Sequence, residues 1–192
     1  MEEYEVKFLG IDPNTIVQKL LQAGATKSFD RIFHRAVFDY ADLRLDAKGA
    51  WVRVRDEGDR VTFGYKQRLG YEPGADEAKN DLGMLEEEVE VSDFETTCRI
   101  LRHIGLVNKF YIENRRVQYR LDGVEVDIEY WPALEPYIEI EGTSWAEVDS
   151  TIDKLGLNPA EKKLFSTTQI YARAGINDKD YSRLTFAEMV KK

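Results

Sequence analysis

The 192-residue chain has little of several features that mark particular classes of protein, such as disulfide-rich, membrane-spanning or nucleic-acid-binding proteins. Its single cysteine, Cys98, cannot form an internal disulfide. No apolar run approaches the ~20 residues that a membrane-spanning helix needs. Basic residues are outnumbered by acidic ones, 27 to 36, and a net charge of −9 repels nucleic acid and anionic membranes on average. We therefore expect neither a nucleic-acid partner nor a membrane partner.

The first residues also lack the basic and apolar segments of a secretory signal. Together with the lone cysteine, this predicts a cytoplasmic protein. No linker or low-complexity segment interrupts the chain, and its length suits one domain that buries roughly 70% of its unfolded surface. We expect a single domain over residues 1–192.

What the chain does have is charge arranged with period two. The opening stretch MEEYEVKF alternates charged and apolar residues, and the same alternation recurs in WVRVR (51–55), VTFGYKQR (61–68), VEVDIEY (124–130) and YIEIE (137–141). Side chains alternate between the two faces of a strand, so each stretch predicts an antiparallel strand with one charged and one apolar face.

Helix signals separate these strands. Pro directly after an Asp N-cap starts one predicted helix, and two Ser-x-x-Glu capping boxes start two more. The three helices run from Asp12 to Gly24, from Ser92 to Gly105 and from Ser144 to Gly156, and a fourth is expected over residues 159–174. Residues 69–83 are rich in Gly, Asp and Glu and predict a mobile loop, whose role composition does not define.

The charged sides of these strands point either to solvent or into the interior of the protein. For a single strand, a solvated face is the more common interpretation. Here the alternation repeats in about six strands, and each strand carries mainly one sign of charge. The apolar strand faces can cover the apolar stripes of the helices, and a sheet closed on itself then has a polar interior. We therefore predict an α+β fold: a closed antiparallel β-barrel with a charged lumen and helices outside, the barrel in about 1–142 and C-terminal helices in about 144–192.

Clustered like charges inside a protein need compensation. The basic group consists of Arg53, Arg55, Lys66 and Arg68, and the acidic group of Glu88, Glu90, Glu125, Asp127, Glu129, Glu139 and Glu141. Divalent cations compensate clustered carboxylates, and a polyphosphate compensates clustered Arg and Lys.

These residues resemble the signature of the CYTH domain, or triphosphate tunnel metalloenzymes. The family includes class IV adenylate cyclases, thiamine triphosphatases and inorganic triphosphatases. The resemblance covers roughly residues 1–175 and follows one order along the chain: Glu3-x-Glu5-x-Lys7, Arg53-x-Arg55, Lys66, Glu88-x-Glu90, Arg116, Asp127 and Glu139-x-Glu141.

The resemblance implies a tunnel of eight antiparallel strands and assigns roles within it. One or two Mg²⁺ or Mn²⁺ ions would be held by Glu3, Glu5, Asp127, Glu139 and Glu141. The triphosphate would be bound by Lys7, Arg53, Arg55, Lys66 and Arg116. Glu88 and Glu90 would orient those basic residues or bind metal. Among all of these, Glu5, Lys7 and Glu141 are the expected catalytic residues.

The first functional interpretation is metal-dependent hydrolysis of inorganic triphosphate or a nucleoside triphosphate. The alternatives are a class IV adenylate cyclase, which converts ATP to cyclic AMP and pyrophosphate, and a non-catalytic polyphosphate sensor. Many relatives have a tyrosine where this chain has Val37, which weakens the thiamine triphosphatase interpretation. His34 is predicted to face away from Arg35 and is not an expected catalytic residue. The sequence leaves the oligomeric state open, a homodimer included.

Overall fold

The computed structural model describes residues 4–71 and 84–192, so Glu3 and most of the predicted loop 69–83 lie outside the described residues. The helices are α1 (Pro13–Gln22), α2 (Phe94–His103), α3 (Trp145–Lys154) and α4 (Thr167–Arg173). The strands are β1 (Tyr4–Phe8), β2 (Thr26–Tyr40), β3 (Ala50–Asp56), β4 (Val61–Arg68), β5 (Met84–Val91), β6 (Leu106–Leu121), β7 (Val124–Tyr130), β8 (Tyr137–Gly142), β9 (Tyr181–Leu184) and β10 (Met189–Lys191). Short 3-10 turns lie at Asp46–Lys48, Pro159–Glu161 and Asp178–Asp180.

The chain divides into two compact units. The first unit contains Met1–Ile32 and Asn114–Asp180, and the second contains Phe33–Glu113 and Tyr181–Lys192. The long strands β2 and β6 contribute residues to both. In the first unit, β6, β7, β8 and β1 follow one another in the sheet, and in the second unit β2, β3, β4 and β5 do. Within each unit, the pairings between these neighbouring strands are antiparallel, which confirms the antiparallel α+β class.

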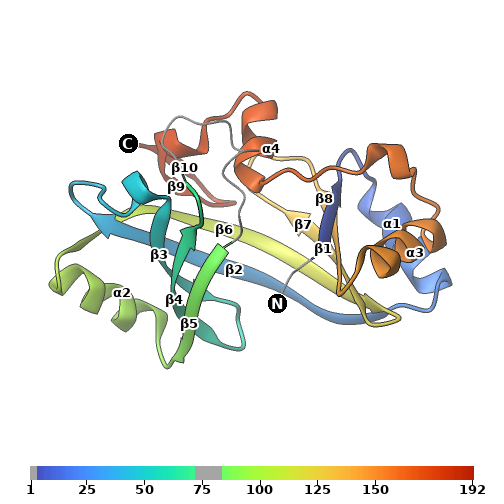
Figure 1. Ribbon diagram of the computed structural model, residues 1–192, viewed down its shortest axis with the longest axis horizontal. Coiled ribbons are helices and arrows are strands. Elements are labelled where there is room, and N and C mark those ends of the chain that lie inside the picture. Colours follow the sequence, from blue (N-terminus) through green and yellow to red (C-terminus); the bar gives the residue numbers. More distant parts are fainter. Residues whose placement is uncertain (1–3, 72–83) are drawn as a thin grey trace. The chain divides into compact units, whose positions relative to one another are not determined.

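The core of the first unit lies between helices and the apolar face of its strands (Figure 1). Ile16 and Leu20 of α1 and Val148 and Ile152 of α3 belong to the same buried cluster as alternate strand residues such as Val126. The prediction that helices cover the apolar strand faces is confirmed here, and it directs the charged residues of these strands to the opposite face.

The second unit has the same arrangement with one helix. Cys98 and Leu101 of α2 pack with Ala36, Phe38 and Val54 on the apolar face of β2 and β3 (Figure 1). Cys98 is fully buried, and burial raises the pKa of its thiol to about 11, so it is an inert apolar residue of this core.

The eight strands form a path that begins at β1 and ends at β5. Within the described ranges, no backbone pairing is found between these two strands, so the pairings show an antiparallel sheet and do not show the closed barrel predicted from the sequence. One edge of β1 pairs with a segment outside the strands. Lys7 N–H donates to the Lys163 carbonyl at 2.8 Å, and Lys163 N–H donates to the Lys7 carbonyl at 2.9 Å.

Two helix boundaries also differ from the predictions. The cap of α2 is Asp93, whose side chain accepts from Thr96 N–H, and not Ser92. Residues 159–174 do not form one helix: the 3-10 turn Pro159–Glu161 is followed by an extended segment, and α4 begins after Ser166 with a complete capping box to Gln169. The extended segment is what allows Lys163 to pair with β1.

None of the described helices is long and apolar enough to cross a membrane.

Candidate functional site

The charged face of the first unit is built by register. Cross-strand partners have side chains on the same face of a sheet. Lys7 of β1 pairs with Glu139 of β8, Glu139 with Asp127 of β7, and Asp127 with Gln118 of β6. A neighbouring row joins Glu5, Glu141, Glu125 and Arg120. These two rows contain five of the residues that were predicted to bind metal or substrate: Glu5, Lys7, Asp127, Glu139 and Glu141. The sixth, Arg116, pairs with Glu129 in the next row.

Arg116 is the centre of this face. Its guanidinium contacts Asp127 at 2.6 Å, Glu139 at 3.0 Å and, through Nε, the carboxylate of Glu129. Burial by itself would lower the pKa of Arg116, but the negative charges of Glu129, Asp127 and Glu139 outweigh it and raise that pKa. Arg116 is therefore a permanent cation held among three acids.

Lys7 connects the edge strand to the same group. Its Nζ contacts the carboxylates of Glu5 and, at 3.3 Å, Glu139. Lys7 is buried, so its ammonium group lies within the acidic face and is shielded from solvent. Glu5 and Glu139 therefore share Lys7 as an ion-pair partner.

Three carboxylates on this face fit a divalent cation. Oxygen atoms of Asp127, Glu129 and Glu139 lie within 4.8 Å of one another, and Asp127 and Glu129 are buried. The Oδ1 atom of Asp127 is buried and has no hydrogen-bond partner among the described residues. Hard cations such as Mg²⁺ and Mn²⁺ take carboxylate oxygens as ligands, so this donor set suits them.

The three carboxylates of this cluster share one guanidinium group, that of Arg116. Burial, which is the largest cause, and the negative charges of Glu129 and Glu139 raise the pKa of Asp127 to about 7, even though Arg116 lowers it. A divalent cation at this cluster would favour the ionised form of Asp127 and compensate the remaining negative charge.

The second unit has its own charged face, on β3, β4 and β5. Arg53 contacts Glu88 at 3.0 Å and Glu86 at 3.5 Å, and Lys66 contacts Glu86 at 2.6 Å. Arg55 contacts Glu57 and lies 3.7 Å from Glu88. The predicted basic residues of this unit are therefore brought together.

Their mutual repulsion is visible in the pKa values. Burial and the neighbouring charge of Arg53 lower the pKa of Lys66. Burial would raise the pKa of Glu88, but its hydrogen bond with Arg53 and the charge of Arg55 hold that pKa below its usual value. Arg53, Arg55 and Lys66 are matched by three carboxylates, those of Glu57, Glu86 and Glu88, so a polyanion that binds here must replace carboxylate partners.

Gly64 has no side chain that would separate Arg53 from Glu88. In the register Gly64 of β4 lies between these two residues, which belong to β3 and β5. A Cβ atom on Gly64 would lie 2.9 Å from the backbone oxygen of Glu87 and 3.4 Å from Cβ of Glu88. The missing side chain lets the Arg53 guanidinium cross β4 to reach its partner.

Glu90 lies on this face opposite Thr62, which pairs with Arg55, and its predicted role stays a prediction. Within the described part of the chain, Glu90 is not an ion-pair partner of Arg53 or Lys66. Glu86 makes these contacts instead, and could have been found by extending the alternation of β5 by one step.

Three further residues were missed, for different reasons. Glu129 was recognised as part of the acidic group but assigned no role, although its side chain is fully buried beside Arg116. Asn114, which donates to Glu129, gives no sequence signal because a single amide in a strand is unremarkable in composition. Lys163 is brought to β1 only by the long-range pairing with Lys7.

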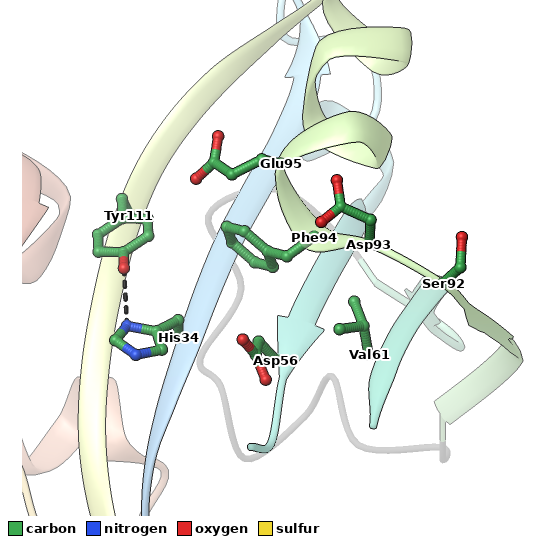
Figure 2. Close-up of a pocket in the computed structure, with 8 residues that line it drawn as sticks. All are labelled: His34, Asp56, Val61, Ser92, Asp93, Phe94, Glu95 and Tyr111. Carbon is green, nitrogen blue, oxygen red and sulfur yellow. Dashed lines mark hydrogen bonds between the residues drawn. The ribbon is translucent and has the colours of Figure 1, made fainter. Parts of the chain in front are cut away.

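A separate pocket of about 350 Å³ lies on the α2 side of the second unit. It is lined by His34, Asp56, Val61, Ser92, Asp93, Phe94, Glu95 and Tyr111, and Figure 2 shows His34 of β2 hydrogen-bonded to the Tyr111 hydroxyl of β6 (2.7 Å). Three carboxylates line it and no Lys or Arg does, so it repels a polyphosphate. The register pairs His34 with Asp56 and Arg35 with Arg55, so His34 lies on the face opposite Arg35, as predicted.

The fold and these faces define an α+β protein with an antiparallel sheet that carries buried acidic and basic groups on its polar side. The family model of the CYTH domain matches residues 1–170, and the chain belongs to the CYTH domain family. No curated protein matches the chain significantly.

Solved structures share the fold at low sequence identity. A conserved hypothetical protein from Pyrococcus furiosus has a TM-score of 0.65 at 18% identity, covering 88% of this chain and 99% of its own. A Vibrio parahaemolyticus protein described as a candidate adenylate cyclase has a TM-score of 0.68 at 12% identity, covering 88% and 97%. HpAC1 from Hippeastrum, an adenylyl cyclase candidate described as having a dominant triphosphatase activity, has a TM-score of 0.57 at 17% identity, covering 91% and 95%.

Proposed function

We propose that this protein is a metal-dependent phosphohydrolase that acts on triphosphate-containing small molecules, inorganic triphosphate or a nucleoside triphosphate. The observation that carries the proposal is the cluster of Asp127, Glu129 and Glu139, whose oxygens lie close enough to share one cation and whose three carboxylates share one guanidinium group. A polyanion sensor needs basic residues but has no use for this cluster.

The metal would be Mg²⁺ or Mn²⁺, held by Asp127, Glu129 and Glu139, with Glu5 and Glu141 in the adjacent row. When bound, such an ion neutralises phosphate oxygens and lowers the pKa of a coordinated water. Glu3 was also predicted as a ligand and lies outside the described residues.

The basic residues of each unit would bind phosphate oxygens. In the second unit, Arg53 and Arg55 offer planar guanidinium groups suited to bidentate contacts, and Lys66 adds a point charge. In the first unit, Lys7 and Arg116 would make such contacts. Each must exchange a carboxylate partner for a phosphate oxygen, so Glu86 and Glu88 hold the basic side chains in place until substrate arrives.

Phosphoryl transfer needs positioning and charge neutralisation more than covalent help. In hydrolysis, a water attacks the terminal phosphorus in line, the bond to the bridging oxygen breaks, and the shortened phosphate chain leaves. Glu141 or Glu5 would orient that water and accept its proton, and Lys7 would neutralise the developing charge. Cyclisation of ATP uses the same charges with the ribose 3′-hydroxyl as nucleophile, so the direction of substrate binding decides between the two reactions.

A product assay tests the proposal. Purified protein is incubated with Mg²⁺ or Mn²⁺ and, separately, tripolyphosphate, ATP or thiamine triphosphate, and both phosphate and cyclic AMP are measured. We expect phosphate from tripolyphosphate or ATP, no cyclic AMP, and no turnover in excess EDTA. Cyclic AMP with equal pyrophosphate would show a cyclase instead. Tight triphosphate binding that is unchanged by EDTA, without any product, would show a sensor.

A further inference from the structure

Asn114 of β6 is fully buried and donates from Nδ2 to Glu129 Oε2 at 2.8 Å. Glu129 is itself fully buried, and its other oxygen accepts from Arg116 Nε. Asn114 and Arg116 are two residues apart on one strand, so their side chains lie on the same face. The two oxygens of Glu129 are therefore each fixed by a different donor from β6.

The orientation of the Asn114 amide follows from this contact. An ionised carboxylate accepts hydrogen bonds and donates none, so the amide must present its NH₂ group to Glu129. Its Oδ1 atom is then buried and has no hydrogen-bond partner among the described residues. A buried acceptor without a partner costs free energy. The Asn114 side chain therefore donates a hydrogen bond to Glu129 while its own Oδ1 accepts none among the described residues.

We propose that Asn114 is a positioning residue that holds the Glu129 carboxylate in the orientation in which it binds a divalent cation together with Asp127 and Glu139. The inference rests on the proposed function, because it assumes that this cluster binds metal. Each carboxylate oxygen has a second lone-pair direction, so Glu129 can keep both donors and still face a cation. Hydrogen bonds to a ligating carboxylate fix its orientation, and their loss weakens metal binding.

A simpler role would be to satisfy a buried carboxylate with no effect on metal binding. The two roles differ in what the variant Asn114→Leu changes, because leucine has nearly the same shape and lacks the donor. A purely structural role predicts a lower melting temperature with unchanged metal affinity. Positioning predicts weaker metal binding, by about tenfold or more, in the protein that remains folded.

The experiment measures Mn²⁺ affinity by titration calorimetry and by electron paramagnetic resonance, without substrate. The matched control is Asn177→Leu, because Asn177 also donates to a carboxylate (Asp180, 2.8 Å) but is exposed. We expect the control to bind Mn²⁺ like wild type and Asn114→Leu to bind it at least tenfold more weakly. Equal affinity in Asn114→Leu and wild type would overturn the inference and leave the proposed function intact. A wild-type protein that binds no Mn²⁺ would overturn both.

A second comparison covers the case in which Asn114→Leu does not fold because Glu129 loses a partner. Glu129→Gln removes the buried charge, so Asn114→Leu added in that background leaves a neutral amide without its partner, which costs less than a charged carboxylate without one. If Asn114 acts through Glu129, the double variant binds Mn²⁺ within twofold of Glu129→Gln alone. A further tenfold loss in the double variant would show that Asn114 acts independently of Glu129, which contradicts positioning.

Discussion

At the scale of single residues, the ionisation of Asp127 depends strongly on its surroundings. Burial and two neighbouring acids raise its pKa to about 7, against Arg116, which lowers it. The ordinary value for an aspartate is 3.8. Between these two values the folded protein retains a proton that the unfolded chain has already released. Stability must therefore depend on pH in this range.

The direction of that dependence is fixed. The native state binds more protons than the unfolded state between about pH 4 and pH 7, so this contribution to the free energy of unfolding is full below pH 4 and is lost as pH rises to about 7. In EDTA, we expect the melting temperature of wild type to fall over this range relative to Asp127→Asn, by several degrees. Parallel curves for the two proteins, measured by differential scanning calorimetry from pH 4.5 to 8, would contradict the prediction.

Sequence reasoning was most successful for residues that repeat a pattern. Glu5, Lys7, Arg53 and Lys66 lie on charged faces because alternation is a local property of a strand. It failed for Asn114, whose role depends on which carboxylate is opposite, and it assigned no role to Glu86, which the register places opposite Lys66. Cross-strand neighbours are set by register, which alternation alone does not fix.

At the scale of elements, the pairing of β3, β4 and β5 depends on Gly64. Its missing side chain allows Arg53 to reach Glu88 across β4, and an added Cβ would meet the Glu87 backbone oxygen at 2.9 Å. A backbone atom cannot rotate away like a side chain, so β5 must shift to accept an alanine here.

We therefore expect Gly64→Ala to destabilise the protein by about 1–3 kcal/mol and to weaken triphosphate binding severalfold, because Glu88 no longer holds Arg53 in place. Urea denaturation and triphosphate calorimetry measure the two effects. Gly142→Ala is the comparison: the three atoms nearest its Cβ would be side-chain atoms of Glu147 and Val148, all at 3.3 Å, and not a backbone oxygen at 2.9 Å. A loss in Gly142→Ala as large as that in Gly64→Ala would show that the contact with Glu87 is not the cause.

The helix ends show how local signals compete. Both Ser92 and Asp93 are residue types that cap helices. The cap of α2 is Asp93, whose Oδ1 accepts a hydrogen bond from Thr96 N–H at 2.7 Å. Residues 159–174 contain helix-forming side chains, yet the segment before Ser166 is extended. There the backbone of Lys163 forms two hydrogen bonds with the backbone of Lys7. A local sequence pattern does not predict this long-range pairing.

At the scale of the whole chain, the pairing of Lys163 with Lys7 joins segments that are far apart in the sequence. The closed barrel was predicted from complementary faces, which show what a sheet would bury but not which strand edges meet. The structure gives the edge of β1 to Lys163. The local sequence pattern thus predicted which side chains share a face of each strand. It did not predict that the backbone of Lys163 pairs with β1.

The same pairing adds a basic residue to the charged face. Antiparallel partners have side chains on one face, so Lys163 lies on the face that carries Lys7, Glu5 and Glu139. We expect Lys163→Met to raise KM for triphosphate about tenfold while Mn²⁺ affinity stays within twofold, because the removed charge attracts phosphate and would repel the metal. The backbone hydrogen bonds to Lys7 survive this change, so the melting temperature should be nearly unaffected.

Lys162→Met is the control for the loss of one positive charge. Its ammonium group contacts Asp149 at 2.7 Å, away from the charged face, so its removal changes the net charge equally without touching the phosphate site. Steady-state kinetics at fixed Mg²⁺ compare the two variants. A similar rise in KM for both would mean that only the overall charge of the protein matters. A rise confined to Lys163→Met would mean that long-range pairing positions a phosphate-binding residue that no local motif reveals.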